Sequence, residues 1–286
     1  MIYHIPHQMT PGLRKECAIH DEGLINVSVD SIRSKHPTLA DYLARFFQRA
    51  EGVQFQKAVA QIPAGARVLD IGVGSGETSL YLASQGYRVA VVEPSDGFCR
   101  LLEQAALLYG LTIDVYCTTA EHLDGLPLRD LDACIFNASL HHCDAPALAL
   151  RHCRTLLKPG GQLLLLNEPL LHFFRSKTWF QKKIERGDLV GDYGGNEHTY
   201  YYQEYRAMLR DAGFAKIADR LSERYAQPGS YLAYLRQENI SAPQRWLRAL
   251  YYRTIQAICR AGWLGRPLLA LGKRLSLLQT NFIATR

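Results

Sequence analysis

Three glycines at alternate positions are the strongest chemical signal in this sequence. Gly72, Gly74 and Gly76 follow an apolar, partly β-branched run at 67–71, and a helical pattern follows at 78–85. On a strand-to-helix turn, glycine tolerates positive φ and lets the backbone approach a ligand without a Cβ in the way. Turns of this kind usually bind a nucleotide, so the pattern predicts a nucleotide site here.

Acidic residues beside the turn indicate which nucleotide it would take. A dinucleotide fingerprint needs a third glycine where this chain has Glu77. A pyrophosphate would lie on the first amides of the helix, where Glu77 would repel it. Asp70, just ahead of the turn, adds a second carboxylate. A nucleoside with an ammonium group and no phosphate suits this environment, and S-adenosylmethionine meets that description.

A second strand pattern ends in another carboxylate. The run at 87–92 leads into Glu93-Pro94-Ser95, and Glu93 follows Gly72 by 21 residues. A carboxylate about 20 residues after the first glycine is the usual partner of the ribose hydroxyls. The glycine turn, helix, strand and terminal acid together predict a nucleoside site.

Five motifs between roughly 62 and 170 extend the pattern, at Val68–Gly76, Val92–Ser95, Thr119–Leu123, Leu131–His142 and Leu157–Glu168. In order and spacing they resemble the class I S-adenosylmethionine-dependent methyltransferases. The nearest subgroup is the small-molecule enzymes similar to the quinone-biosynthesis C-methyltransferases. Outside this span the resemblance is faint, and it fixes no substrate.

The resemblance implies a role for each motif in holding S-adenosyl-L-methionine, or its product S-adenosyl-L-homocysteine. The turn would hold the methionine moiety, the second strand end the ribose, and the corner at 119–121 the adenine. Family members often have Asp at the position of Thr119, where a hydroxyl could still accept from the adenine amino group. The end of the fourth strand would lie beside the sulfonium. The implied cofactor residues are Asp70, Gly72, Gly74, Gly76, Glu93, Pro94, Ser95, Thr119, Ala120, Glu121, Asn137 and Ala138.

Methyl transfer from a sulfonium is an in-line displacement, so the protein mainly positions the reactants and removes a proton from the acceptor. The candidate bases are His141, His142 and His198, because the free pKa of His lies nearest neutrality. A structural role for the first two, capping the turn that follows, is an equal alternative. We expect the loop around His198 to bind the substrate, although a plain surface loop is the other interpretation. The candidate substrate residues are Glu168, Asp192, Tyr193, Glu197 and Tyr200.

Strand and helix patterns alternate along the chain. Apolar strands are expected near 67–72, 87–92, 111–117, 131–137 and 162–167, with helices at 77–86, 96–109 and 144–157. Such alternation predicts a doubly wound parallel sheet with right-handed crossovers. A sixth strand is expected at 214–220 and a seventh at 280–285, and the resemblance implies that the seventh is antiparallel. The predicted fold is therefore α/β, a Rossmann-like sheet of seven strands with helical insertions on the ligand face.

The predicted organisation surrounds this core with three further pieces. Residues 1–61 would form an N-terminal cap or lid, and 62–220 the cofactor-binding core with a substrate-loop insertion at 169–200. A basic amphipathic insertion at 221–279 would precede the final strand at 280–286. Because ligands bind at the carboxyl ends of the strands, both insertions should project on the ligand face.

The last insertion is strongly basic. From Asn239 to the end the chain has no Asp or Glu and eight basic residues. A helix over 245–261 would set an apolar half, with Trp246 and Leu250, against a basic half. It could be a helix with a solvated basic face, a lid on the acceptor pocket, or a contact with an anionic membrane through 245–274. A lid would bury Trp246 and Leu250. The basic residues are Arg245, Arg248, Arg253, Arg260, Arg266, Lys273, Arg274 and Arg286.

Composition sets further bounds. The 286 residues suffice for one large α/β domain with appended helices. Neither an apolar run of the ~18 residues that span a bilayer nor a signal-peptide pattern is found, which favours the cytoplasm, with or without peripheral membrane contact. The seven cysteines include no CxxC pair, which argues against structural zinc. Cys143 and Cys153 are too far apart to share a helical turn, so we expect no metal.

The expected function is therefore methyl transfer to a small-molecule or a lipid- or carbohydrate-linked acceptor in a biosynthetic pathway. The acceptor atom (O, N, C or S) and the oligomeric state stay open. A protein that binds S-adenosylmethionine for another purpose, such as a regulatory one, is the alternative. No basic patch interleaved with aromatics occurs on the core, so nucleic acid is not an expected partner.

Overall fold

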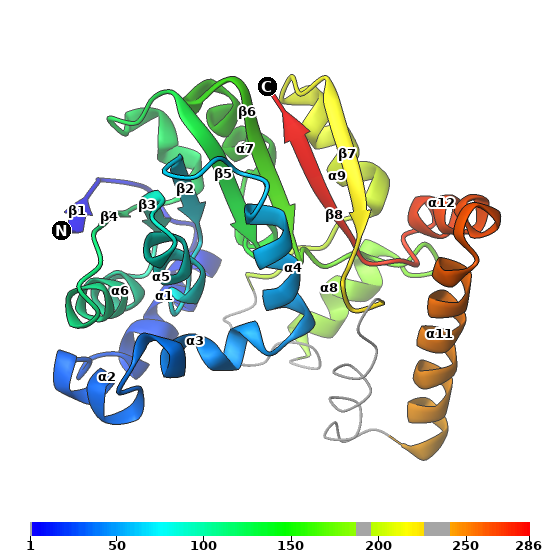
Figure 1. The fold of residues 1–286 in the computed structure, drawn as a ribbon, viewed down its shortest axis with the longest axis horizontal. Helices are drawn as coiled ribbons and strands as arrows, with labels where there is room; N and C mark the ends of the chain where they lie inside the picture. The colour runs from blue at the N-terminus through cyan, green and yellow to red at the C-terminus, as the bar shows by residue number, and fades with distance from the viewer. Residues whose placement is uncertain (1, 187–195, 226–240) are drawn as a thin grey trace.

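The computed structural model describes residues 2–186, 196–225 and 241–286. Its centre is a sheet in the order β1-β4-β3-β2-β5-β6-β8-β7, with helices on both faces (Figure 1). The strands are β1 (Ile2–His4), β2 (Arg67–Ile71), β3 (Arg88–Glu93), β4 (Ile113–Cys117), β5 (Leu131–Asn137), β6 (Leu157–Leu166), β7 (Lys216–Leu221) and β8 (Thr280–Thr285).

The helices of the core follow the alternation expected from the sequence, and others precede or follow them. They are α1 (Pro11–Gly23), α2 (Val29–Lys35), α3 (Leu39–Phe47), α4 (Ala50–Val59), α5 (Glu77–Ser84), α6 (Asp96–Leu108), α7 (Pro146–Leu156), α8 (Lys177–Glu185), α9 (Tyr202–Asp211), α11 (Ala242–Arg260) and α12 (Arg266–Arg274). Short 3₁₀ turns are η1 (Ala120–Gly125), η2 (Leu140–His142) and η3 (Gly262–Gly265).

The doubly wound Rossmann-like fold is confirmed, with one correction to the strand count. The seven expected strands are present, and β8 runs antiparallel to both β6 and β7. The sheet has eight strands because β1 adds to its edge, in parallel with β4 and with Ile2 opposite Val115. A strand of three residues is too short to show the alternation by which strands are recognised in a sequence.

Two hydrophobic cores lie on opposite faces of the sheet. On one face α7 and α9 bury Leu150 and Tyr205, and on the other α5 and α6 bury Leu80 and Leu102. Burying a side chain of this size contributes roughly 1.5–3 kcal/mol, so the sheet is held firmly from both sides. The ends of its strands are therefore a rigid base for a site.

The strand order reverses at β2, which pairs with β3 on one side and β5 on the other. The chain leaves β2 toward β3 on one side, and it leaves β5 toward β6 on the other side. Because these two connections diverge, a crevice opens between β2 and β5 at the carboxyl ends of the strands. The glycine turn after β2 and the loop after β5 meet at this crevice.

Helices α11 and α12 lie beside the edge of the sheet formed by β7, and α11 extends past the carboxyl end of that strand (Figure 1). A small separate core of Tyr225, Tyr252, Ile255 and Leu278 attaches them. Trp246 and Leu250 are 64% and 46% exposed, so the burial expected for a lid is not found. Tyr252 and Ile255 are buried in their place because α11 turns this side toward the domain.

Candidate functional site

Positive φ angles at the glycine turn explain why glycine is needed there. Gly72 and Gly74 have φ of +70° and +51°. A Cβ on Gly72 would lie 2.6 Å from Cβ of Ser139, whereas one on Gly74 would meet open space. Gly72 therefore lets the loop after β5 approach the end of β2, and Gly74 leaves the backbone open toward a ligand. Gly76, with φ of +83°, makes room for Leu102 of α6.

The two acids of the turn have partners within the protein. Asp70 accepts hydrogen bonds of 2.7 Å from the hydroxyls of Thr78 and Ser79 at the start of α5. Burial raises the pKa of Asp70 to about 6, although these hydroxyls oppose the shift. Its side chain faces α5, so it fastens the turn to the helix and does not reach the cavity as the sequence suggested. Glu77 accepts from the hydroxyl of Ser75.

Glu93 lies at the end of β3 with its carboxylate against the glycine turn. Oε2 accepts from the backbone N–H of Gly74 at 3.1 Å, and Oε1 accepts from that of Ser95 at 2.9 Å. Burial raises the pKa of Glu93 to about 7, against the lowering effect of these backbone hydrogen bonds. Each oxygen accepts one of these hydrogen bonds, so each keeps a lone pair for a further donor.

A cavity of about 610 Å³ opens at this point, within the range of small-molecule sites. Among the residues described, none of those that line it is Lys or Arg. The cavity brings together many of the expected site residues and several that were not expected. It is lined by Leu13, Glu16, Cys17, His20, Ile71, Gly72, Gly74, Ser75, Val92, Glu93, Pro94, Ser95, Phe98, Thr119, Ala120, Glu121, Ala138, Ser139, His141, His142, Cys143 and Glu197.

Helix α1, within the segment expected to form an N-terminal cap, supplies one wall of the cavity, and none of its residues was among the expected site residues. Leu13, Glu16, Cys17 and His20 all come from this helix. Its start has a recognisable signal, since Thr10 caps the helix and Pro11 occupies the first position. That signal predicts the helix, whereas which of its residues line the cavity depends on how the helix packs.

The corner at 119–121 lines the cavity as expected for an adenine site. The hydroxyl of Thr119 lies 2.9 Å from Nδ1 of His122, so it already has one hydrogen-bond partner. Glu121 accepts from the backbone N–H of Ala145 at 3.0 Å, which ties this corner to the start of α7.

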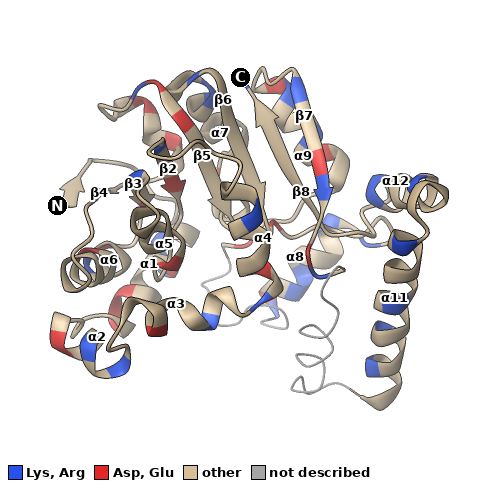
Figure 2. Ribbon diagram, viewed as in Figure 1, with Lys and Arg blue, Asp and Glu red and all other residues tan. Residues whose placement is uncertain are grey.

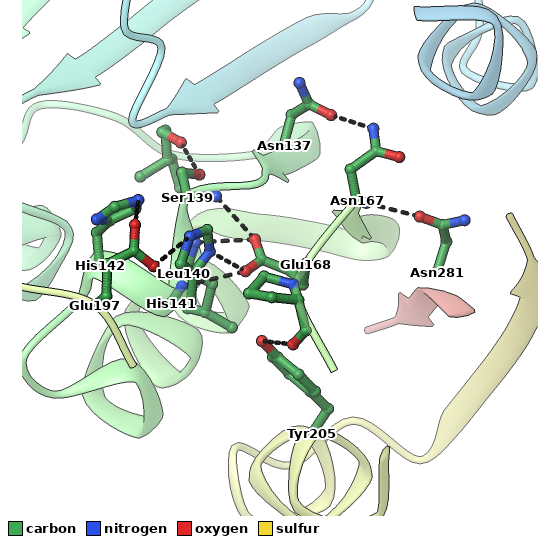
Figure 3. A network of polar contacts seen from close by, with 12 residues as sticks. Asn137, Ser139, Leu140, His141, His142, Asn167, Glu168, Glu197, Tyr205 and Asn281 are labelled. Atoms are coloured by element: carbon green, nitrogen blue, oxygen red, sulfur yellow. Dashed lines mark hydrogen bonds and ion pairs between the residues drawn. The ribbon is translucent and has the colours of Figure 1, made fainter. Parts of the chain in front are cut away.

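Glu168, just after β6, anchors the loop after β5 (Figure 3). Its Oε1 accepts from the amides of Ser139 and Leu140, both at 2.9 Å, and its Oε2 from the amide of His141 at 3.1 Å and from Nδ1 of that ring at 2.8 Å. Burial raises the pKa of Glu168, but the His141 ring and the amides outweigh it and lower the pKa overall. Four donors fill this carboxylate, so the structure corrects its expected role from substrate contact to positioning residue.

The imidazoles of His141 and His142 lie together at one end of the cavity. Nε2 of His141 is 3.5 Å from one oxygen of Glu197, and Nε2 of His142 is 3.6 Å from the other. Nδ1 of His142 is 3.0 Å from Glu16 of α1. Burial lowers the pKa of His142, but the hydrogen bond and charge of Glu16, with the charges of Glu197 and Glu168, raise it to about 9. His142 is therefore protonated at neutral pH.

Several expected site residues are not among those that line the cavity, although the ring of His198 lies near enough to His141, His142 and Glu197 to feel their charges. Asn137 turns from the cavity and accepts from Asn167 at 2.8 Å, while its neighbour Ala138 lines it (Figure 3). The backbone N–H of His198 donates to the carbonyl of His141, and burial lowers the pKa of its ring. Tyr200 packs against Tyr205. The expected roles of these three residues stay predictions, and Asp192 and Tyr193 lie outside the described residues.

Comparison with known proteins agrees with this geometry. Residues 69–165 match the family model described as a methyltransferase domain. A ubiquinone biosynthesis O-methyltransferase from Xanthomonas axonopodis pv. citri is 34% identical over 103 residues, 36% of this chain and 43% of the relative. The S-adenosyl-L-methionine-dependent Diels-Alderase iccD from Talaromyces variabilis is 27% identical over 165 residues, 56% of each chain. The chain thus spans about half the length of these relatives.

A solved structure supports the fold over most of the chain. The [4+2]-cyclase SpnF aligns with a TM-score of 0.53 at 20% identity, covering 84% of this chain and 81% of its own. At this identity the likeness shows the fold alone. Residues 69–165 contain a methyltransferase domain, and this part of the chain is similar to S-adenosylmethionine-dependent methyltransferases.

Proposed function

We propose that the chain transfers a methyl group from S-adenosylmethionine to a hydroxyl of a small-molecule acceptor in a biosynthetic pathway. The observation that carries the proposal is the cavity at the reversal of strand order, with the buried carboxylate of Glu93 at one end and the imidazole pair at the other. An oxygen acceptor is supported by the Xanthomonas relative, whose name describes an O-methyltransferase.

The residues present fit the cofactor. The open space beside Gly74 leaves room for a ligand against the turn, and Glu93 offers acceptor oxygens for two ribose hydroxyls. The described lining contains neither Lys nor Arg, so a phosphate would lack partners, while Glu16 and Glu121 favour a cationic ligand. When bound, the cofactor would supply an electrophilic methyl carbon. The chain would hold it in line with the acceptor oxygen.

The His141–Glu168 pair is the better candidate to receive the acceptor proton. Glu168 is ionised and can only accept, so a His141 ring with one proton would carry it on Nδ1. The lone pair of Nε2 then points toward Glu197 and the cavity. His142 already carries a proton, which suits it to orient an anionic or polar acceptor.

A second candidate is a protein that uses S-adenosylmethionine without transferring its methyl group. The iccD relative favours it, because its name describes a Diels-Alderase that depends on S-adenosyl-L-methionine. The two candidates share the cofactor site and differ in the fate of the methyl group.

Incubation with a trideuteromethyl cofactor and a small-molecule extract should separate them. We expect mass spectrometry to detect an extract component that gains the labelled methyl group. The Glu93→Ala variant should label it more weakly, because losing the ribose hydrogen bonds costs about 1–3 kcal/mol of cofactor binding. Stoichiometric cofactor binding in calorimetry with no labelled product from any acceptor would favour the second candidate.

We also propose that α11 and α12 bring the enzyme to an anionic membrane. Among the exposed residues of this unit are Trp246, Trp263, Leu264, Leu268 and Leu271, and Figure 2 shows its charged positions as basic. Interfacial tryptophans with a basic face are typical of helices that lie on a bilayer. The described part of 221–279 contributes no residue to the cavity, so a membrane contact explains the surface better than a lid. None of the described helices is long and apolar enough to cross a membrane.

Flotation with anionic liposomes tests this surface. At low ionic strength each Lys or Arg near the bilayer contributes about 1 kcal/mol, so the protein should float with the vesicles. Binding should fall in high salt, where charges are screened, and in the Trp246→Ala/Trp263→Ala variant. Neutral phosphatidylcholine vesicles are the control. Failure to float at low salt would refute the membrane contact.

The pKa of Glu93 predicts how cofactor affinity depends on pH. The carboxyl is protonated in the ligand-free protein below pH about 7, instead of at its ordinary value of 4.5. The ionised form accepts both ribose hydroxyls, so binding should release a proton below that pH. The dissociation constant should rise about tenfold from pH 8 to pH 6.

Calorimetry in buffers of different ionisation enthalpy measures both quantities. The Glu93→Gln variant has no carboxyl to titrate, so its weaker binding should change much less over this range. Equal affinity at pH 6 and pH 8 in the unmodified protein, with no proton release, would show that Glu93 is not a ligand of the ribose.

A further inference from the structure

Three side chains of metal-ligand type converge at the acceptor end of the cavity. His141 and His142 come from η2, and Glu197 from the segment ahead of α9. One ligand atom from each lies within 4.8 Å of the others. The two separations between Nε2 and a Glu197 oxygen, 3.5 and 3.6 Å, are long for hydrogen bonds. Each is close to the spacing of about 3.4 Å between two atoms that bind one tetrahedral ion at about 2.1 Å, the first measured to one oxygen of Glu197 and the second to the other.

The second nitrogen of each ring has a carboxylate partner. Nδ1 of His141 lies 2.8 Å from Glu168, and Nδ1 of His142 lies 3.0 Å from Glu16. A carboxylate there holds a proton on Nδ1 and directs Nε2 toward an ion, which is the outer arrangement that metal-binding imidazoles usually have. The carboxylate partner on each ring is a second observation that points to a metal ion, independent of the spacing between the ligand atoms.

Charge at this end of the cavity also favours a cation. The carboxylates of Glu16, Glu168 and Glu197 surround two imidazoles, and the described lining has no Lys or Arg. Three carboxylates, two neutral rings and a divalent ion would carry a net charge of about −1, so the ion would offset most of the negative charge of the carboxylates. The ion would displace the proton of His142, as imidazole ligation requires.

We propose that His141 Nε2, His142 Nε2 and Glu197 bind a divalent metal ion of the Zn²⁺ or Co²⁺ class. Two imidazole ligands favour these ions over Mg²⁺ and Ca²⁺, which prefer oxygen. Three protein ligands leave a position open toward the cavity, as in catalytic sites. This step rests on the proposed function: the open position would take the oxygen of the acceptor hydroxyl, which is more acidic when it binds a metal ion. The ion would then replace His141 as the group that assists loss of the proton from the acceptor hydroxyl.

The residues near the two histidines in the sequence do not predict a metal, because Cys143 and Cys153 are too far apart to share a helical turn. Glu197 lies 55 residues after His142, and only the fold brings it to the rings. A second group, His4, Asp96 and Cys117, also lies within 4.8 Å, at the edge of the sheet. Its His4 is exposed and is 3.9 Å from Asp96, so it provides a matched control.

Titration of the chelator-treated full chain with Co²⁺ and Zn²⁺ tests the site. We expect one equivalent of Co²⁺ to give visible d–d bands and calorimetry to show one Zn²⁺. Glu197→Gln and His142→Gln should each weaken binding at least tenfold, and His4→Gln should leave it unchanged. Gln keeps the size and hydrogen-bonding capacity of Glu197, so circular dichroism of the variant should show an intact fold.

Zn²⁺ binding weaker than about 1 mM, or equal binding by Glu197→Gln and the unmodified chain, would overturn the inference. A loss confined to His4→Gln would also overturn it, since it would place the ion at the sheet edge. Metal binding is measured without cofactor or acceptor, so its outcome is independent of whether the chain transfers methyl groups.

Discussion

The hydrogen bonds that the carboxylate of Glu168 accepts hold the loop that presents both imidazoles to the cavity. A buried carboxylate is costly unless its oxygens are hydrogen-bonded, and here four N–H donors from three consecutive residues satisfy them. These bonds tie the end of β6 to the loop after β5. The hydroxyl of Ser139 in that loop donates to the carbonyl of Ile71 at 2.5 Å, which adds the end of β2 to the same unit. Removing Glu168 would free the loop that presents both imidazoles.

Two buried carboxylates at the same edge of the sheet have different tasks because their surroundings differ. Glu168 has an imidazole and three amides, its pKa is lowered, and its oxygens are fully used. Glu93 has fewer donors, burial raises its pKa, and its oxygens keep capacity for a ligand. The first therefore positions protein groups, and the second is available to bind. This contrast separates the loop anchor from the proposed ribose site without reference to any other protein.

The parts of the site that depend on local pattern could be predicted from the sequence. The glycine turn, Glu93 and the strand–helix alternation are encoded within short segments, and the structure places them as expected. Contacts between distant segments could not be predicted in this way. The wall formed by α1, and the approach of Glu197 to the rings, depend on how far-apart elements pack.

The direction of side chains at the ends of strands was also not predictable from the sequence. Asn137 and Ala138 are neighbours, yet only Ala138 lines the cavity, because successive side chains at the end of a strand point in different directions. On α11 the helical wheel identified an apolar side correctly, but the domain buries Tyr252 and Ile255 and leaves Trp246 exposed. The wheel shows which residues share a face, whereas the neighbouring elements decide which face is covered.

In the proposed function, one cavity joins a cofactor end at Glu93 to an acceptor end at the imidazole pair. A crystal structure with S-adenosylhomocysteine tests it most directly. We expect both ribose hydroxyls within hydrogen-bond distance of the Glu93 carboxylate, the adenine beside Thr119–Glu121, and the sulfur on the side of the cavity that His141 lines. A ligand bound elsewhere, or one whose sulfur points away from His141, would contradict the account.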